Sequence, residues 1–133
     1  MIHGLSHITF VVSDLDRMTH FLTVLFDAEE VYASGETFRS LSREKFFVLG
    51  GLWIAVMEGD PLAEITYNHI AFAISPADID VYAERATSMG IEVLPGRGRS
   101  AGEGQSLYFY DYDNHLFELH TGTLAERLAA YEK

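Results

Sequence analysis

Apolar and polar residues alternate over short stretches in much of this chain, a pattern typical of half-buried β-strands. Two longer stretches instead repeat apolar residues every three or four positions, which predicts amphipathic helices. In the first half, Asp14 is a suitable N-cap for a helix whose apolar positions run from Leu15 to Leu25. The elements predicted there are a strand at 6–12, a helix at 14–26, and strands at 31–33, 37–41, 46–49 and 52–57.

The second half repeats this order. Ser75–Asp78 reads as the start of a helix with a capping box and with Pro76 at its first position, and Gly90 ends the same helix. Strands are predicted at 69–74, 91–94, 106–110 and 116–120. A further capping box at Thr123–Glu126 predicts a C-terminal helix over about 123–132. Its apolar side chains are expected to face inward: Leu124, Leu128 and Tyr131.

Two of the predicted strands begin with nearly the same phrase. Ser-His-Ile-Thr-Phe-Val-Val at 6–12 returns 62 positions later as Asn-His-Ile-Ala-Phe-Ala-Ile at 68–74. We interpret the chain as one domain of 133 residues with an α+β fold, built from two βαβββ modules at about 4–58 and 66–121. Neither module can bury both faces of its sheet alone, so the modules must pair with each other or with those of a second chain.

The composition narrows the class of partner. Hydrophobic residues make up 48% and charged residues 22%, as in ordinary globular proteins. There is no cysteine, which excludes a disulfide, a thiolate metal site and a cysteine nucleophile. The net charge of −11 argues against nucleic acid or an anionic membrane as the partner. We find no signal peptide and no run of roughly 18 apolar residues, so we expect a cytoplasmic protein without membrane spans.

The repeated phrases place a histidine at the same point of each module. Pseudo-symmetry would aim His7 and His69 at one site, and Glu118 on the last predicted strand adds a carboxylate. Two imidazoles and a carboxylate suit Mn²⁺, Fe²⁺, Zn²⁺ or Ni²⁺. The same offset from Glu118 falls on Val56, so the fourth position holds no ligand. The pattern is therefore that of a catalytic metal with vacant coordination sites.

Two further residues are alternative ligands. His120 shares the strand face of Glu118, and Glu58 shares that of Val56. A single strand histidine is more often a core or surface residue than a ligand, and only the repeat favours metal binding here. The repeat also favours Glu118 over both alternatives.

A glycine-rich loop at 96–104 contains Arg97 and Arg99. Converging backbone amides and forked guanidinium groups would suit a phosphate or phosphonate. The loop could equally be a solvated hairpin connection. Arg127, near the start of the last predicted helix, could join this anion site or be an ordinary exposed charge.

Glu44 adjoins the apolar run 46–49. A carboxylate at the edge of an apolar pocket can act as a general base, although most such glutamates are surface residues in turns. Trp53, Tyr67 and Tyr108 lie on or beside predicted strands, where they would line a pocket or fill the core equally well.

The chain also resembles a known family over essentially its whole length. The family is the vicinal oxygen chelate superfamily of glyoxalases, bleomycin resistance proteins and dioxygenases, and within it the fosfomycin-resistance proteins. The resemblance rests on Gly-Leu-Trp at 51–53, Tyr-Asn-His-Ile-Ala-Phe at 67–72, Gly-Glu-Gly at 102–104, Tyr-Phe-Tyr-Asp at 108–111, Asn-His-Leu-Phe-Glu at 114–118 and Gly-Thr-Leu-Ala-Glu-Arg at 122–127. Ser-Arg-Glu-Lys-Phe-Phe at 42–47 resembles the segment of the FosX-type epoxide hydrolases whose glutamate is the general base.

This resemblance implies an Mn²⁺-dependent enzyme, with no organic cofactor, that adds water to the small anionic epoxide fosfomycin. It implies that His7, His69 and Glu118 bind the metal and that Glu44 is the general base. It also implies a homodimer in which each metal takes His7 from one subunit and its other two ligands from the partner. The residues implied around the drug are Thr9, Trp53, Tyr67, Arg99, Ser106, Tyr108 and Arg127.

Three positions bear on which activity the resemblance implies. Gln105 stands where the hydrolases usually have arginine and Ile65 where they usually have a basic residue, which predicts weaker binding of the drug or a different anionic epoxide. Thr9 stands where the bacillithiol transferases have cysteine, which disfavours that class. Two alternatives remain, a metal-dependent glutathione transferase acting on fosfomycin and a non-catalytic drug-binding resistance protein. Product that forms only with glutathione would favour the first, and failure to retain a divalent metal the second.

Overall fold

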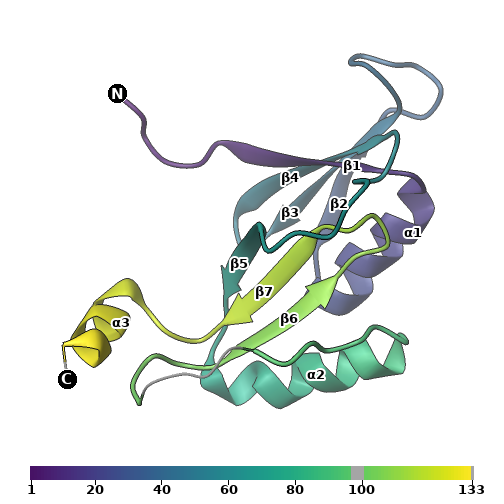
Figure 1. The fold of residues 1–133 in the computed structure, drawn as a ribbon. Helices are drawn as coiled ribbons and strands as arrows, with labels where there is room; N and C mark the ends of the chain where they lie inside the picture. The colour runs from purple at the N-terminus through teal and green to yellow at the C-terminus, as the bar shows by residue number, and fades with distance from the viewer. Residues whose placement is uncertain (97–100, 133) are drawn as a thin grey trace. The chain divides into compact units, whose positions relative to one another are not determined.

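The computed structural model describes residues 1–96 and 101–132 and confirms the α+β fold class (Figure 1). The chain divides into two compact units. Unit 1 consists of Met1–Ile65 together with the short segment Asp111–His115, and unit 2 consists of the remaining residues from Thr66 onward. Within the described residues, no helix is long and apolar enough to cross a membrane.

Unit 1 contains a four-stranded sheet in the order β1-β4-β3-β2, with β1 parallel to β4 and the other neighbours antiparallel. The predicted helix continues without a break, but its second half is a π-helix. The elements are β1 (His7–Val12), α1 (Leu15–His20), the π-helical segment η1 (Phe21–Leu25), β2 (Glu29–Ala33), β3 (Glu44–Leu49) and β4 (Leu52–Glu58).

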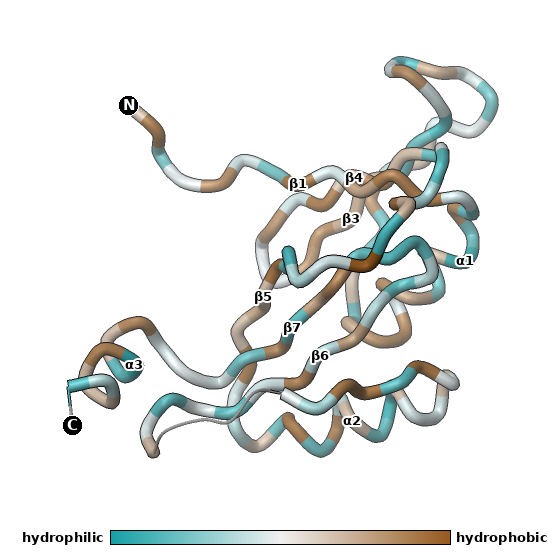
Figure 2. The backbone as a smooth tube through the Cα atoms, in the orientation of Figure 1, coloured by the Kyte–Doolittle hydropathy of each residue, from teal (hydrophilic) through white to brown (hydrophobic). Residues whose placement is uncertain are grey.

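Side chains of β1 alternate between the two faces of this sheet. Phe10 and Val12 are buried on the face that α1 and η1 cover, whereas His7 and Thr9 lie on the opposite face and are exposed. Figure 2 shows hydrophobic stretches along β3 and β4, which supply much of the buried layer. Other core residues of unit 1 include Met18, Phe21, Leu22, Leu25, Phe47, Ile54 and Val56. Each such side chain stabilises the fold by roughly 1.5–3 kcal/mol through removal from water.

The turn between β3 and β4 fixes the register in which these two strands pair, and so fixes which side chains lie on the His7 face of the sheet. Gly50 and Gly51 have φ of 56° and 79°, as a two-residue type I′ hairpin requires. This turn sets Leu49 opposite Leu52, and the same register places Glu44 opposite Met57. Directly opposed residues share a face, so the turn decides on which side of the sheet Glu44 lies.

Unit 2 contains a three-stranded sheet in the order β5-β7-β6, with β5 parallel to β7 and β6 antiparallel to it. The elements are β5 (His69–Ala73), the 3₁₀ turn η2 (Pro76–Asp78), α2 (Ile79–Ser88), β6 (Ser106–Tyr110), β7 (Leu116–His120) and α3 (Leu124–Tyr131). Hydrophobic and hydrophilic residues alternate along α2 in Figure 2, and Ala86 at the centre of its apolar side is fully buried. The predicted capping box of α3 is present, between Thr123 and Glu126, whereas Ser75 makes no side-chain cap.

Two predicted strands are wrong. Residues 37–41 form bends and irregular chain, and their apolar members Phe38 and Leu41 are 53% and 92% exposed, so these side chains have no surface to pack against. The strand predicted at 91–94 is reduced to one bridge, between Leu94 and Tyr108. The Ile91 N–H is bonded back to the end of α2 at Ala86, and Pro95 has no N–H to donate, so the ladder cannot extend.

The predicted inward face of α3 is also wrong. Leu124, Leu128 and Tyr131 are 74%, 53% and 55% exposed, and Ala130 is the helix's buried residue. A capping box depends on local chain geometry, so it forms as predicted. Burial of an apolar side depends on a packing surface, which the single chain does not give these three residues.

The segment that joins β6 to β7 is bonded to the start of α1, 100 residues away in sequence. Asp113 is buried, and its Oδ1 accepts hydrogen bonds from the backbone N and the Oγ of Ser13, both at 2.9 Å. Asp111 is also buried and accepts from the backbone N–H of His115, with the His115 ring Nδ1 at 2.7 Å from its other oxygen. The Asp113–Ser13 bonds connect this segment to the rest of unit 1, to which Asp111–His115 belongs.

Candidate metal centre

His69 and Glu118 are brought together by the parallel pairing of β5 and β7. The register sets Glu118 opposite Ala71, two residues after His69, so both side chains lie on one face of the sheet. His69 Nε2 is 3.0 Å from Glu118 Oε1, and the Glu118 side chain is only 6% exposed. Unit 2 thus places two predicted metal ligands in direct contact.

The main chain fixes the orientation of the His69 ring. Its Nδ1 lies 2.7 Å from the carbonyl oxygen of Tyr67, and a carbonyl oxygen only accepts, so Nδ1 carries the proton. In the neutral ring Nε2 has a lone pair that could bind a metal together with the carboxylate oxygen, and in the doubly protonated ring Nε2–H donates to Glu118 directly. The 3.0 Å separation is also that of two adjacent ligand atoms each about 2.1 Å from one divalent metal, so the pair fits a metal ion.

The second oxygen of Glu118 is contacted by one residue of the neighbouring strand β6 and by one of its own strand β7. Ser106 Oγ donates to Glu118 Oε2 at 2.6 Å, and His120 Nδ1 lies 3.5 Å from the same oxygen. Tyr108 is opposite Glu118 in the register, is 4% exposed, and its hydroxyl is 3.2 Å from that of Tyr67. Ser106, Tyr67 and Tyr108, all predicted substrate contacts, therefore surround the His69–Glu118 pair.

A cavity of about 320 Å³ lies beside this pair. Arg127 lines it, with one guanidinium nitrogen 3.4 Å from His120 Nε2 and Nε 3.9 Å from the buried carboxylate of Glu103. The other lining residues are His69, Ala71, Glu118, His120, Gly122, Thr123 and Leu124. Arg97 and Arg99 of the predicted anion loop lie outside the described residues.

The other predicted ligand, His7, lies in unit 1. Its ring stacks on Trp53 at a centroid distance of 4.1 Å, and Ser6 Oγ is 3.0 Å from its Nδ1. Thr9 is on the same exposed face of β1. Among residues 1–96 and 101–132, no cluster of three or more His, Asp or Glu side chains could hold a metal ion, so the three-ligand set remains a prediction.

Glu44 begins β3 and is 8% exposed. It is opposite Met57, which is opposite Val11, so Glu44 lies on the same sheet face as His7. A cavity of about 270 Å³ in unit 1, which Glu44 also lines, is bounded by Arg43, Lys45 and Glu58, so it belongs to the other face of the sheet and does not bear on this placement. The structure therefore gives Glu44 a buried position on the face of the predicted ligand, rather than the exposed position of an ordinary turn glutamate.

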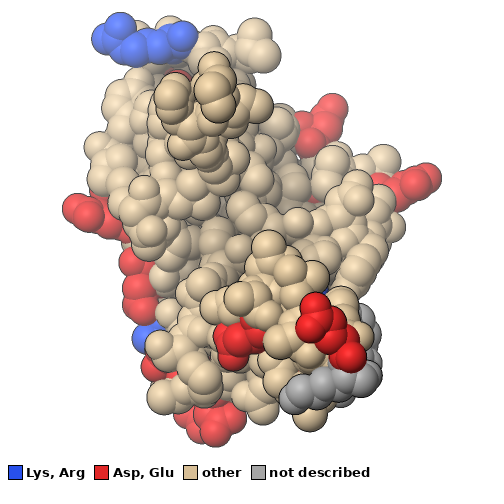
Figure 3. All heavy atoms as spheres, turned by 90° about the vertical axis from the view of Figure 1, so that its left-hand side faces the viewer, with Lys and Arg blue, Asp and Glu red and all other residues tan. Residues whose placement is uncertain are grey.

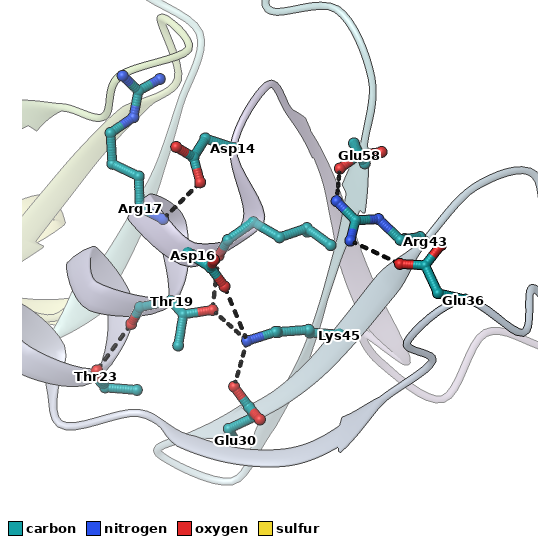
Figure 4. A network of polar contacts seen from close by, with 11 residues as sticks. Asp14, Asp16, Arg17, Thr19, Thr23, Glu30, Glu36, Arg43, Lys45 and Glu58 are labelled. Carbon is teal, nitrogen blue, oxygen red and sulfur yellow. Dashed lines mark hydrogen bonds and ion pairs between the residues drawn. The ribbon is translucent and has the colours of Figure 1, made fainter.

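The two residues that flank Glu44 point away from that face into ion pairs (Figure 4). Lys45 Nζ is 2.8 Å from Glu30 and 3.0 Å from the hydroxyl of Thr19. Arg43 is hydrogen-bonded to Glu58, and this bond raises the pKa of the guanidinium above its ordinary value. Neither cation therefore stands next to Glu44 on the His7 face.

The strand registers correct one step of the repeat argument. The paired strands are offset by 63 residues, from 53 to 116, whereas the histidines are offset by 62, from 7 to 69. Glu118 is opposite Ala71, and the equivalent pair in unit 1 is Thr9 with Ala55. Val56 instead faces the core and is 1% exposed. Because Ala55 is also apolar, the position equivalent to Glu118 still has no ligand.

The alternative ligands differ in position. His120 lies on the face of Glu118, as the alternation predicts. Glu58 is opposite Val12 in the register, so it lies on the face opposite His7 and pairs with Arg43 there.

Comparison with known proteins identifies the family of the chain. Residues 4–119 match the family model described as "Glyoxalase/Bleomycin resistance protein/Dioxygenase superfamily". The chain belongs to this superfamily.

Within the superfamily, the chain is similar to proteins named for fosfomycin resistance. It is 61% identical over 133 residues to the fosfomycin resistance protein FosX of Listeria innocua, with both chains covered in full. It is 42% identical over 138 residues to the metallothiol transferase FosB of Shouchella clausii, covering 100% of this chain and 90% of that protein.

The chain is also similar to a solved structure. A mutant FosX from Listeria monocytogenes, complexed with Mn(II) and 1S,2S-dihydroxypropylphosphonic acid, has a TM-score of 0.90 and 56% identity. The match covers 98% of this chain and 99% of that one.

Sequence reasoning missed two parts of this centre. The Tyr67 carbonyl that orients His69 is a main-chain group, so no pattern of side chains in the sequence predicts it. Glu103 is 1% exposed beneath Arg127. The flanking Gly102 and Gly104, both with positive φ, were the available signal that this stretch approaches other backbone closely.

Proposed function

We propose that this protein is an Mn²⁺-dependent epoxide hydrolase that adds water to the oxirane of fosfomycin and so inactivates the antibiotic. The observation that carries the proposal is the His69–Glu118 pair, an imidazole nitrogen and a carboxylate oxygen 3.0 Å apart on one sheet face, the separation of two ligands of one metal ion. The FosX relatives support the choice of Mn²⁺ and the reaction. One of them is complexed with Mn(II) and a dihydroxypropylphosphonic acid, and addition of water to fosfomycin yields a phosphonate of that kind.

The proposed metal ligands are His7, His69 and Glu118. When bound there, Mn²⁺ would supply Lewis-acid stabilisation of the negative charge that develops on the epoxide oxygen. The protein's contribution is orientation. The Tyr67 carbonyl fixes the tautomer of His69, and Ser106 fixes one oxygen of Glu118, so the remaining lone pairs face the same point.

Glu44 is the proposed general base. Its carboxylate takes one proton from a water molecule as the water oxygen bonds to a ring carbon. The bond between that carbon and the ring oxygen breaks, the released oxygen takes a proton from solvent to give the second hydroxyl of the diol, and Glu44 returns its proton to solvent. The buried position of Glu44 on the His7 face supports this assignment.

The phosphonate requires local positive charge, because the protein as a whole carries a net charge of −11. In the view of Figure 3, acidic groups lie at several places and basic groups at few. Arg127 lines the cavity beside Glu118, which supports its assignment to the phosphonate. Arg99 is proposed as a second contact, and Thr9, Trp53, Tyr67, Ser106 and Tyr108 as the remaining wall.

We further propose a homodimer in which His7 of one subunit joins His69 and Glu118 of its partner. The exposed apolar residues of α3 support an association of this kind, since Leu124, Leu128 and Tyr131 are more than half exposed in the single chain.

A thiol-free assay by ³¹P NMR tests the hydrolase. Fosfomycin and enzyme are mixed with Mn²⁺, and in parallel with Zn²⁺, Ni²⁺ or chelator. The expected result is a diol signal that requires metal and falls at least about 100-fold in rate in Glu44→Gln, as loss of a general base predicts. Glu29→Gln, an exposed glutamate on the neighbouring strand β2, should behave like the unchanged protein. Absence of diol, or equal rates in Glu44→Gln and the unchanged protein, would show the assignment to be wrong.

A thiol transferase is the second candidate, favoured by the 42% identity to a metallothiol transferase. The same assay separates the two. A phosphonate product that forms only when glutathione or another thiol is added would establish transfer and exclude the hydrolase.

A further inference from the structure

Ser106 lies between two side chains of the neighbouring strand β7. Its Oγ is 2.6 Å from Glu118 Oε2 and 2.7 Å from His120 Nδ1. Ser106 is directly opposite His120 in the antiparallel register, and Glu118 is the next residue on the same face. The three side chains therefore meet by strand pairing, independently of any loop.

The hydrogen-bonding capacity of these groups fixes the direction of each bond. The carboxylate of Glu118 only accepts, so the single proton of the Ser106 hydroxyl is donated to Oε2. The hydroxyl must then accept from His120, whose Nδ1 carries a proton. That N–H also faces Glu118 Oε2 at 3.5 Å, which is another acceptor.

The opposite side of the His120 ring agrees with this tautomer. Its Nε2 faces a guanidinium nitrogen of Arg127 at 3.4 Å, and a guanidinium only donates, so Nε2 is the acceptor. Close packing keeps this side of the ring in place. A Cβ added at Gly122 would lie 2.8 Å from His120 Nε2 and 2.4 Å from the carbonyl oxygen of Glu103.

We propose that His120 is a positioning residue that acts through Ser106 to hold Glu118 as a metal ligand. The hydrogen bonds run from Arg127 to His120, from His120 to Ser106 and from Ser106 to Oε2 of Glu118, which leaves Oε1 directed at His69 Nε2. This inference rests on the proposed function, because it needs Glu118 to bind the metal. Outer partners of metal ligands typically change metal affinity about 10–100-fold when they are removed.

Mn²⁺ binding without substrate tests the proposal, by electron paramagnetic resonance of free Mn²⁺ at increasing protein concentration. His120→Ala removes the donor, and the dissociation constant is expected to rise about 10–100-fold. His120→Asn keeps an N–H at the place of Nδ1, and it is expected to bind within about threefold of the unchanged protein. His120→Gln places its amide at the position of Nε2 instead, and is expected to resemble His120→Ala.

The variants also separate this proposal from the proposed function. If the unchanged protein fails to bind Mn²⁺, or if Glu118→Ala binds as well as it does, the metal site itself is wrong. If Glu118→Ala loses binding while His120→Ala keeps it, only the positioning role is wrong. Weak binding by His120→Asn with an unchanged melting temperature also overturns the role, since it would point to His120 as a direct ligand.

A second variant covers the case in which His120→Ala does not fold. Ser106→Ala removes the shared hydroxyl and is expected to weaken Mn²⁺ binding to the same extent as His120→Ala. Ser106→Thr retains the hydroxyl and is expected to retain Mn²⁺ binding. A ¹⁵N NMR spectrum of the metal-free protein gives an independent readout. It should show the proton of His120 on Nδ1, and a proton on Nε2 alone would contradict the proposal.

Discussion

His69 Nδ1 lies 2.7 Å from the carbonyl oxygen of Tyr67, two residues earlier in the chain. The contact holds the imidazole with Nε2 toward Glu118, and it is made by the main chain. Orientation of this proposed ligand therefore depends on the path of the backbone before β5 rather than on the identity of residue 67.

Tyr67→Phe should consequently leave Mn²⁺ affinity within about twofold of the unchanged protein, because the carbonyl is retained. His69→Ala removes a proposed ligand and should weaken Mn²⁺ binding by more than about 100-fold, the upper range for loss of an outer partner. Titration of Mn²⁺ by calorimetry measures both. A large loss of affinity in Tyr67→Phe would show that the hydroxyl, 3.2 Å from that of Tyr108, orients the site instead.

Asp113→Ala should destabilise the fold by about 2–3 kcal/mol, because a buried carboxylate that accepts two hydrogen bonds from Ser13 is lost. Asp113→Asn keeps a neutral acceptor and should cost about half as much. Urea unfolding measures the difference. Asp16→Asn is the control, since that side chain is 99% exposed and 4.0 Å from Lys45, and it should change stability by less than about 0.5 kcal/mol. Equal effects at both positions would contradict the anchoring role of Asp113.

Thr123→Ala should cost about 1 kcal/mol by removing the N-cap of α3. Glu126→Gln should have a smaller effect, since the amide oxygen can still accept from the Thr123 backbone N–H. Thermal unfolding followed by circular dichroism distinguishes them. If Thr123→Ala melts at the same temperature as the unchanged protein, the capping box does not contribute to stability.

Leu128→Glu places a charge among the exposed apolar residues of α3. If a second copy covers them, the variant should sediment as a monomer at concentrations where the unchanged protein is a dimer, because burial of an unpaired charge is unfavourable. Ala129→Glu, at an exposed position beside it on the helix, is the control and should remain dimeric. A monomeric unchanged protein, or a dimeric Leu128→Glu, would contradict this part of the proposal.

The features predictable from sequence are those that local chain geometry decides. The N-cap at Asp14 and the capping box at Thr123–Glu126 form as predicted because each needs only neighbouring residues. The strand predicted at 37–41 depended on a packing partner for Phe38 and Leu41, and no alternation of residues can supply one.

The proposed site residues also divide into those that local strand geometry predicts and those that depend on the pairing of strands. The repeated phrase located His69, and the strand at 116–120 located Glu118, since position along a strand fixes the face. The fourth position of the repeat was assigned to Val56 rather than Ala55, because a one-residue difference between modules is visible only in the register. The bond from Ser106 to Glu118 likewise depends on which residues oppose each other across β6 and β7.

The most direct test of the hydrolase is the origin of the new oxygen. The enzyme, loaded with Mn²⁺, is incubated with fosfomycin in H₂¹⁸O without any thiol, and the product is analysed by mass spectrometry. A dihydroxypropylphosphonate carrying one ¹⁸O atom, formed at a rate that Glu44→Gln greatly reduces, is the predicted result. Unchanged fosfomycin in the absence of thiol would contradict the account.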